Sequence, residues 1–205
     1  MKRRTIIQTL LITILLVLVY LVYNSIMKPI RFNEEVSKRE AVIIKKLKDI
    51  RSLEVAYKTV FEHYADNFDT LIDFAKNGKI PLIKKKGTVP DSLTEEQAIQ
   101  KKLVSSDTIY ANVCESIFQN KKKIDLANLK YIPFTKKEFT IRAAMITKNS
   151  IEVAVFEITA PYDAYLEGLD KQLILNLKAK AKEFNKYEGL RLGSMDEPTI
   201  IGNWE

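Results

Sequence analysis

The chain has 205 residues, of which 46% are apolar, and its 33 Lys and Arg outnumber 26 Asp and Glu, for a net charge of +7. This length fits one domain of ordinary size with additional segments, and the apolar fraction excludes a chain that is disordered throughout. The single cysteine, Cys114, excludes an internal disulfide. The positive charge suits an anionic membrane surface or an acidic partner.

The first 27 residues predict a membrane anchor. Residues 5–27 contain no charged side chain. As a helix they would rise about 34 Å, enough to cross a hydrocarbon core of about 30 Å. Tyr20 and Tyr23 lie where an aromatic belt would meet the membrane surface. We therefore expect residues 5–27 to form a transmembrane helix that contacts membrane lipids.

A cleaved secretory signal is the alternative to this anchor, because residues 1–4 are basic and an apolar run follows them. The run is long for a signal, however. The residues that follow its apolar centre, 21–28, also lack the spaced small residues of a cleavage site. The sequence therefore favours an anchor that is retained.

Basic residues flank the anchor on both sides, at 2–4 and at 28–39, so their count alone leaves the orientation open. Long domains cross a membrane largely regardless of charge. We therefore expect residues 1–4 to be a cytoplasmic tail and residues 28–205 to lie outside the cytoplasm. This describes a single-pass membrane protein with its domain outside the cytoplasm, where nucleic acid is not an expected partner.

Pro29 is expected to mark the exit from the membrane helix, and residues 33–65 then predict one long helix without Gly or Pro. Apolar side chains recur at heptad spacing in this segment, with Glu40 and Glu54 at two of the corresponding places. Two interpretations stay open, an amphipathic helix packed on its own domain and a coiled coil with a second subunit. The candidate interaction residues are Val36, Ile43, Leu47, Ile50, Tyr57, Phe61 and Tyr64.

The stretch FEHYADNFDTLIDF, residues 61–74, predicts a joint between two helices. Asp66 or Asn67 can cap a second helix over 67–77, and Asp69 would lie favourably in its first turn. Asn77 and Gly78 are expected to end it, with the glycine in a left-handed conformation. Residues 28–77 are thus expected to form a helical stalk with a short capped helix.

The same stretch is also the best candidate for a chemical site, because it holds the only histidine of the chain. His63 and Asp66, followed by Asp69 and Asp73, are a candidate cluster for a divalent metal ion. The other interpretation is helix capping beside a surface histidine. A nucleophile such as Cys114 activated by His63 is a further alternative. We expect no catalytic residue and no cofactor, and keep His63 and Asp66 as candidate metal ligands.

Residues 78–130 are expected to be linker-like and partly helical. Pro81, Gly87 and Pro90 favour a linker, whereas Ser92 with Glu95 fits a capping box that would start a helix over 91–97. A second helical stretch is expected around 110–118. Two lysine triplets, 84–86 and 121–123, are interpreted as solvated loops or as contacts to anionic lipid head groups.

Residues 131–205 predict a small α+β domain. Residues 139–146 and 151–158 read as two strands of a hairpin with a turn at 148–150. A helix is expected over 166–187, with Leu169, Leu173, Leu177 and Phe184 on its apolar side. Extended segments are then expected at 189–193 and 198–201. The predicted fold class is α+β: a transmembrane helix continuing into a long amphipathic helix, then a small antiparallel sheet with a packed helix.

The first part of the chain, residues 5–75, resembles the pilins and pseudopilins of type IV pili and type II secretion. An apolar N-terminal helix continues into an amphipathic one, which closes with aromatic residues and a turn at 57–68. Two features of that family are absent. No glycine precedes the apolar segment as a cleavage site, since Arg4 and Thr5 stand there, and no Glu occupies the fifth residue of the segment. The order of elements also resembles single-pass assembly-platform proteins of the same machines. Residues 160–166 and 202–205 resemble bacterial single-pass proteins of uncharacterised activity.

These observations predict a non-enzymatic, single-pass envelope protein that serves as a scaffold or assembly subunit of a pilus-like or secretion-like machine. Its partners would be other proteins, or a second copy bound through the juxtamembrane helix. A membrane-anchored enzyme or metal-binding domain around His63 is one alternative. A module that binds anionic lipid surfaces through its lysines is another.

Overall fold

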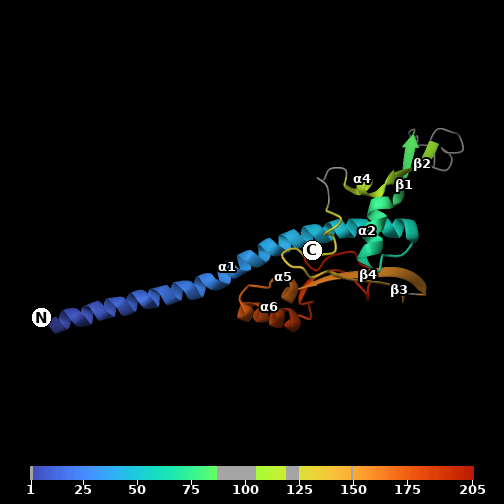
Figure 1. The fold of residues 1–205 in the computed structure, drawn as a ribbon. Coiled ribbons are helices and arrows are strands. Elements are labelled where there is room, and N and C mark those ends of the chain that lie inside the picture. Colours follow the sequence, from blue (N-terminus) through green and yellow to red (C-terminus); the bar gives the residue numbers. More distant parts are fainter. Residues whose placement is uncertain (1, 87–104, 119–124, 149) are drawn as a thin grey trace, which may run out of the picture.

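The computed structural model describes residues 2–86, 105–118, 125–148 and 150–205 (Figure 1). A long helix comes first, and shorter helices alternate with two antiparallel sheets after it. The elements are α1 (Lys2–Phe61), α2 (Phe68–Asn77), β1 (Lys79–Lys86), β2 (Ser105–Asn112), α4 (Val113–Phe118), β3 (Thr140–Lys148), β4 (Ile151–Pro161), α5 (Tyr162–Tyr165), α6 (Lys171–Glu183) and β5 (Gly189–Ser194).

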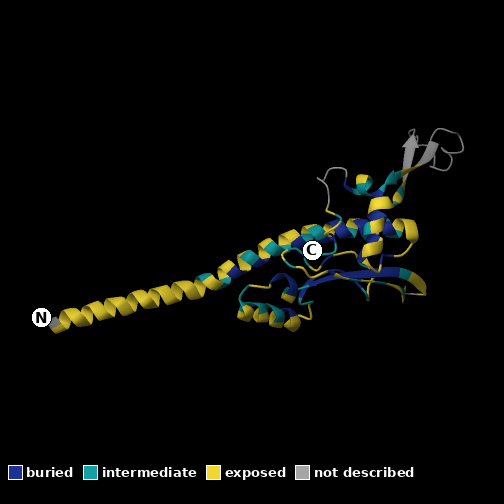
Figure 2. Cartoon of the chain, in the orientation of Figure 1, coloured by how far each residue is buried: buried dark blue, intermediate teal, exposed yellow. Residues whose placement is uncertain are grey.

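Helix α1 is one continuous helix of 60 residues, which corresponds to a length of about 90 Å. Pro29, the expected exit from the membrane helix, lies inside α1 and does not interrupt the helix. The N-terminal half projects away from the rest of the protein and is exposed on all sides (Figure 2). Within the described residues, one helix is long and apolar enough to cross a membrane, and none of its apolar stretch is buried.

The C-terminal half of α1 forms the centre of the hydrophobic core. Ile43, Leu47, Ile50 and Leu53 are each 0% exposed. Residues three and four apart share one face of a helix, so these four side chains form a single apolar stripe. They belong to the same core cluster as the inner side chains of the sheet and of α2. The packing favours the interpretation that this amphipathic helix covers its own domain.

The larger sheet has the order β3-β4-β5 and is antiparallel, and α1 lies along one of its faces (Figure 1). The predicted hairpin is confirmed, with β3 paired to β4 from Thr140 opposite Thr159 to Lys148 opposite Ile151. Asn149 of the predicted turn lies outside the described residues. The rings of Tyr64 and Phe156 lie 4.4 Å apart and join the sheet to the end of the long helix.

The central strand β4 is buried continuously from 154 to 160, rather than on alternate residues. Phe156 and Ile158 contribute to the core beneath α1. On the opposite face, the buried Glu157 carboxylate pairs with Arg142 of β3 and with Arg191 of β5. A buried carboxylate is retained there because two guanidinium groups compensate for its lost hydration.

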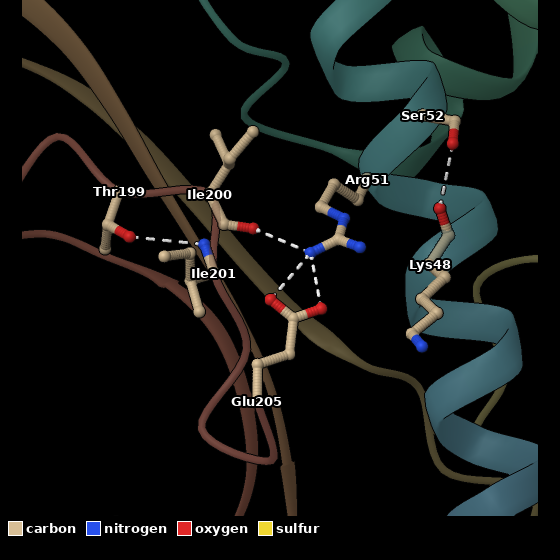
Figure 3. Close-up of polar contacts among 7 residues, drawn as sticks. All are labelled: Lys48, Arg51, Ser52, Thr199, Ile200, Ile201 and Glu205. Atoms are coloured by element: carbon tan, nitrogen blue, oxygen red, sulfur yellow. Dashed lines mark hydrogen bonds and ion pairs between the residues drawn. The ribbon is translucent and has the colours of Figure 1, made fainter.

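The last residues run back along β5 and are tied to α1. Residues 198–201 do not form the predicted edge strand, but Gly193 N donates to Ile201 O and Leu192 bridges Gly202. The Arg51 guanidinium donates to Ile200 O at 3.3 Å and to the Glu205 carboxylate at 2.9 and 3.1 Å (Figure 3). The terminal segment is thereby tied to α1 on one side and to β5 on the other.

The predicted helix over 166–187 is wrong in its bounds. The structure has a single short turn, α5, and then the separate helix α6, with Gly168 in a left-handed conformation between them. The Asp170 carboxylate caps α6 by accepting from Leu173 N, and it pairs with Lys28 of α1 at 2.6 Å. Phe184 follows the end of α6 and is 61% exposed, so it does not extend the apolar side.

Residues 79–86 and 105–112 form a two-stranded antiparallel hairpin, β1 with β2, where a linker was expected. The helix α4 follows directly, within the predicted helical stretch 110–118. Gly78 ends α2 as predicted, but its φ of −70° is not left-handed. A side chain there would collide with the carbonyl and ring of Phe74. The predicted helix 91–97 and the lysines 121–123 lie outside the described residues. The α+β fold class is confirmed.

Candidate functional site

The joint between α1 and α2 is built by backbone capping. α1 ends at Phe61, and Glu62 takes a left-handed φ of 66°. The Asn67 side chain then caps α2 by accepting from Thr70 N at 2.7 Å. This confirms the predicted cap and places its first-turn carboxylate, Asp69, at the positive end of the helix dipole.

His63 and Asp66 lie on one open pocket of about 260 Å³ beside the sheet. The ring nitrogen Nδ1 of His63 lies 2.8 Å from Phe61 O, and its ring packs edge-on against Tyr57. Asp66 accepts from the Asn67 side chain at 2.7 Å. The pocket is lined by Tyr57, His63, Tyr64, Ala65, Asp66, Ala143, Ala144 and Met145.

The other two aspartates of the predicted metal cluster belong to α2. Asp69 and Asp73 are exposed, and the Asp73 carboxylate accepts from Asn77 of the same helix. Among the described residues, no group of three or more His, Cys, Asp or Glu side chains is placed to hold a metal ion. The structure therefore brings His63 and Asp66 to one pocket without completing a metal site around them.

A buried carboxyl, Glu54, lies behind this pocket and was not predicted as a site residue. It is 0% exposed, its Oε2 accepts from Ala65 N at 3.0 Å, and its Oε1 has no partner among the described residues. Burial raises the pKa of Glu54 to about 8, against the lowering effect of the Ala65 hydrogen bond, and the Asp66 charge raises it further. The signal in the sequence was a carboxyl at an apolar heptad position.

Glu40 occupies the other interrupted heptad position and is likewise bonded in the interior. Its Oε1 accepts from the Tyr165 hydroxyl at 2.8 Å. Burial raises the pKa of Glu40, although this hydrogen bond opposes the shift. Burial and the nearby Glu40 raise the pKa of the Tyr165 phenol. Both glutamates that interrupt the pattern are therefore points where α1 binds the domain through polar atoms.

Three cationic side chains of α1 strengthen the same attachment. Arg39 donates to Tyr165 O at 2.8 Å, and its guanidinium lies over the Phe134 ring. Lys46 donates to the carbonyls of residues 128 and 131, and burial lowers its pKa. With Arg51, these residues spread over more than three helical turns. The domain is therefore attached to the C-terminal half of α1 over several turns.

The candidate interaction residues lie mainly inside the protein. Six of the seven are buried in the chain's own core, and Phe61 is 46% exposed while packing on Tyr57 and Phe74. A second copy has no access to the six while this fold holds. The buried six are Val36, Ile43, Leu47, Ile50, Tyr57 and Tyr64.

The structure also places the single cysteine and the first of the two lysine triplets. Cys114 is half-buried in α4 and packs against the core, and burial raises the pKa of its thiol. That shift works against a reactive thiolate. The lysines 84–86 belong to strand β1 and not to a loop.

Comparisons of the chain with protein-family models, with curated proteins and with solved structures found no match. Function must therefore be inferred from the residues and their geometry.

His63→Ala is expected to change the free energy of unfolding by no more than about 0.5 kcal/mol, because the exposed ring caps nothing. It is also expected to leave Zn²⁺ binding, measured by isothermal titration calorimetry, unchanged. Asn67→Ala is the matched control in the same joint and is expected to lose about 1 kcal/mol with the cap. Loss of a stoichiometric Zn²⁺ site in His63→Ala would instead support the metal-binding alternative.

Proposed function

We propose that the protein is a non-enzymatic, single-pass membrane protein whose extracytoplasmic domain acts as a scaffold or assembly subunit in the bacterial envelope. The observation that carries this proposal is the double role of α1. One half of the helix is apolar and exposed all round, and the other half is the centre of the domain's core. A domain built on its own anchor has a set distance from the membrane and a set direction.

The contacts beyond the core support a rigid attachment. Lys28 lies directly after the apolar segment and pairs with Asp170 at the start of α6. Further along, Arg39, Lys46 and Arg51 bind backbone carbonyls of the domain. These contacts begin at the first residue after the apolar segment and continue into the part of α1 that lies in the core. The domain is therefore positioned without a flexible linker.

The arrangement also agrees with the resemblance to pilin-like subunits over residues 5–75. As that resemblance implies, an apolar helical half continues into an amphipathic half before a β-containing globular part. Such a shape suits assembly through the membrane half and presentation of the domain to other envelope proteins. The orientation proposed is N-terminus in, with residues 28–205 outside the cytoplasm, in the inner membrane.

Topology and assembly are tested together in the full-length chain. In a Cys114→Ser background, Lys136→Cys is expected to react with a membrane-impermeant maleimide in spheroplasts, whereas Lys2→Cys is expected to react only after lysis. After chemical cross-linking in native membranes, the protein is expected in a defined complex larger than the monomer. Reversed labelling would contradict the orientation, and recovery as monomer alone would contradict the assembly role.

A further inference from the structure

Strand β3 is an edge of the three-stranded sheet. From residue 141 to 148, its outer side pairs with no other strand of the described part of the chain. The opposite edge, β5, is covered by the returning segment through Gly193 and Gly202. An open edge presents a row of backbone N–H and C=O groups that can pair with another extended chain. The middle of β3, from Ala143 to Ile146, carries no charge that would guard against such pairing.

The pocket beside His63 opens onto this edge. It is lined by three consecutive residues of β3: Ala143, Ala144 and Met145. Consecutive residues of a strand point to opposite faces, so a pocket that touches all three borders the edge of the sheet. Its remaining lining comes from the joint after α1, and none comes from β4. A strand added to β3 would therefore have the pocket beside it.

Asp66 is the one carboxylate among the residues that line the pocket, and it belongs to an acidic segment of a chain that carries a charge of +7 as a whole. Between Lys58 and Lys76 there is no Lys or Arg, and four exposed carboxylates occur there: Glu62, Asp66, Asp69 and Asp73. Lys58 of the chain itself lies over the Tyr64 ring at 4.8 Å, so the Asp66 carboxylate is the group of the pocket that can pair with a partner's cation.

We propose that the open edge of β3 and the pocket beside His63 bind an extended segment of a partner polypeptide. This segment adds a strand to the sheet and places a Lys or Arg side chain against Asp66, which lines the pocket. In this mode backbone hydrogen bonds supply affinity and a side-chain pocket supplies specificity. This inference rests on the proposed function in that the domain serves to bind other proteins. The class of partner is a protein with an extended segment that carries a Lys or Arg.

A second copy of the chain fits this edge less well. Pairing the whole of β3 with itself in antiparallel register is centred on Ala144, so Met145, Ala144 and Ala143 of one copy lie opposite Ala143, Ala144 and Met145 of the other. Such a pairing places no basic residue directly opposite the strand residues that line the pocket. The missing basic partner for Asp66 therefore favours a different polypeptide.

The test is selection of random nonapeptides displayed on phage against the full-length protein in nanodiscs. Enriched sequences are expected to be rich in β-branched and aromatic residues and to share Lys or Arg at one position. For a synthetic selected peptide, Asp66→Asn is expected to weaken binding about tenfold, the loss of one hydrogen bond to a charged group. Asp73→Asn, an exposed carboxylate of α2 outside the pocket, is the matched control and is expected to change it less than twofold.

The strand-addition geometry has its own readout. N-methylation of alternate peptide amides is expected to abolish binding in one of the two possible sets, and peptide binding is expected to slow amide hydrogen exchange within 141–148. No enrichment, no shared basic position, equal effects of the two aspartate variants, or full binding by both methylated sets would each overturn the proposal. So would self-association through β3. None of these outcomes involves membrane location, so the anchored scaffold would stand or fall on its own test.

Discussion

Glu54→Gln is expected to stabilise the protein at pH 7 by roughly 3 kcal/mol. The folded protein raises the pKa of this carboxyl from 4.5 to about 8, so at pH 7 folding must bring a proton onto a group that is ionised in the unfolded chain. One pKa unit corresponds to about 1.4 kcal/mol, and pH 7 lies 2.5 units above the unfolded value. Glutamine needs no proton and keeps an oxygen to accept from Ala65 N.

The same proton gives the wild type a particular pH dependence. Below about pH 4.5 the Glu54 carboxyl is protonated in both states, so its contribution to stability is complete. Between about 4.5 and 8 only the folded state holds the proton, so stability falls as pH rises. Above about pH 8 the proton is lost from the folded state as well, and this contribution no longer changes.

Urea unfolding of the full-length protein in detergent micelles, followed by circular dichroism at several pH values, measures both effects. The difference between Glu54→Gln and wild type is expected to grow from near zero at pH 4.5 to its maximum by about pH 8. Glu34→Gln replaces an exposed carboxyl of the same helix and is expected to follow the wild type throughout. A Glu54→Gln protein less stable than the wild type at pH 8 would contradict the buried neutral carboxyl.

Leu47→Ala is expected to lower the free energy of unfolding by about 2–5 kcal/mol, the usual effect of truncating a fully buried leucine. Leu47 is 0% exposed and lies in the middle of the apolar stripe of α1. Truncation removes apolar contacts and leaves a cavity between the helix and the sheet. Since the free energy of unfolding of a whole domain is about 5–15 kcal/mol, this one substitution removes a large share of the domain's stability.

Val42→Ala is the matched control, because Val42 lies on the same helix but is 47% exposed. It is expected to change stability by less than about 0.5 kcal/mol. Limited proteolysis of membranes distinguishes the two roles of α1. Leu47→Ala is expected to remain in the membrane pellet while its domain is cleaved faster than that of Val42→Ala. Equal cleavage of the two variants would contradict the place of Leu47 in the core.

Elements with local signals could be predicted from the sequence. The Asn67 cap, the apolar run of β4 and the apolar segment of α1 without charged residues each depend on residues close together in the chain. The hairpin of β3 and β4 follows from a turn between two apolar runs. The fold class could therefore be inferred before any contact was known.

Features that depend on distant partners could not be predicted. Glu40 and Glu54 interrupt a heptad pattern, and nothing near them in the sequence indicates that Tyr165 and Ala65 would satisfy them, 125 and 11 residues away. Pro81 and the lysines near it favour a linker when only the local sequence is considered. The pairing that makes β1 a strand comes from the distant residues 105–112.

Pro29 removes one backbone donor from α1, at a cost of about 3 kcal/mol, which a helix of this length tolerates.

The position of α1 in the core also sets the order in which the protein can fold. The apolar stripe of Ile43, Leu47 and Ile50 has been synthesised once Phe61 is added, yet part of its cover, Leu192, comes about 130 residues later. At about 5–20 residues per second, this delay lasts roughly 7 to 26 s. During that interval the stripe is an incompletely covered apolar surface in every nascent chain. Substitutions that delay the docking of β4 and β5 are therefore expected to cause aggregation during synthesis, even where the finished protein is as stable as the wild type.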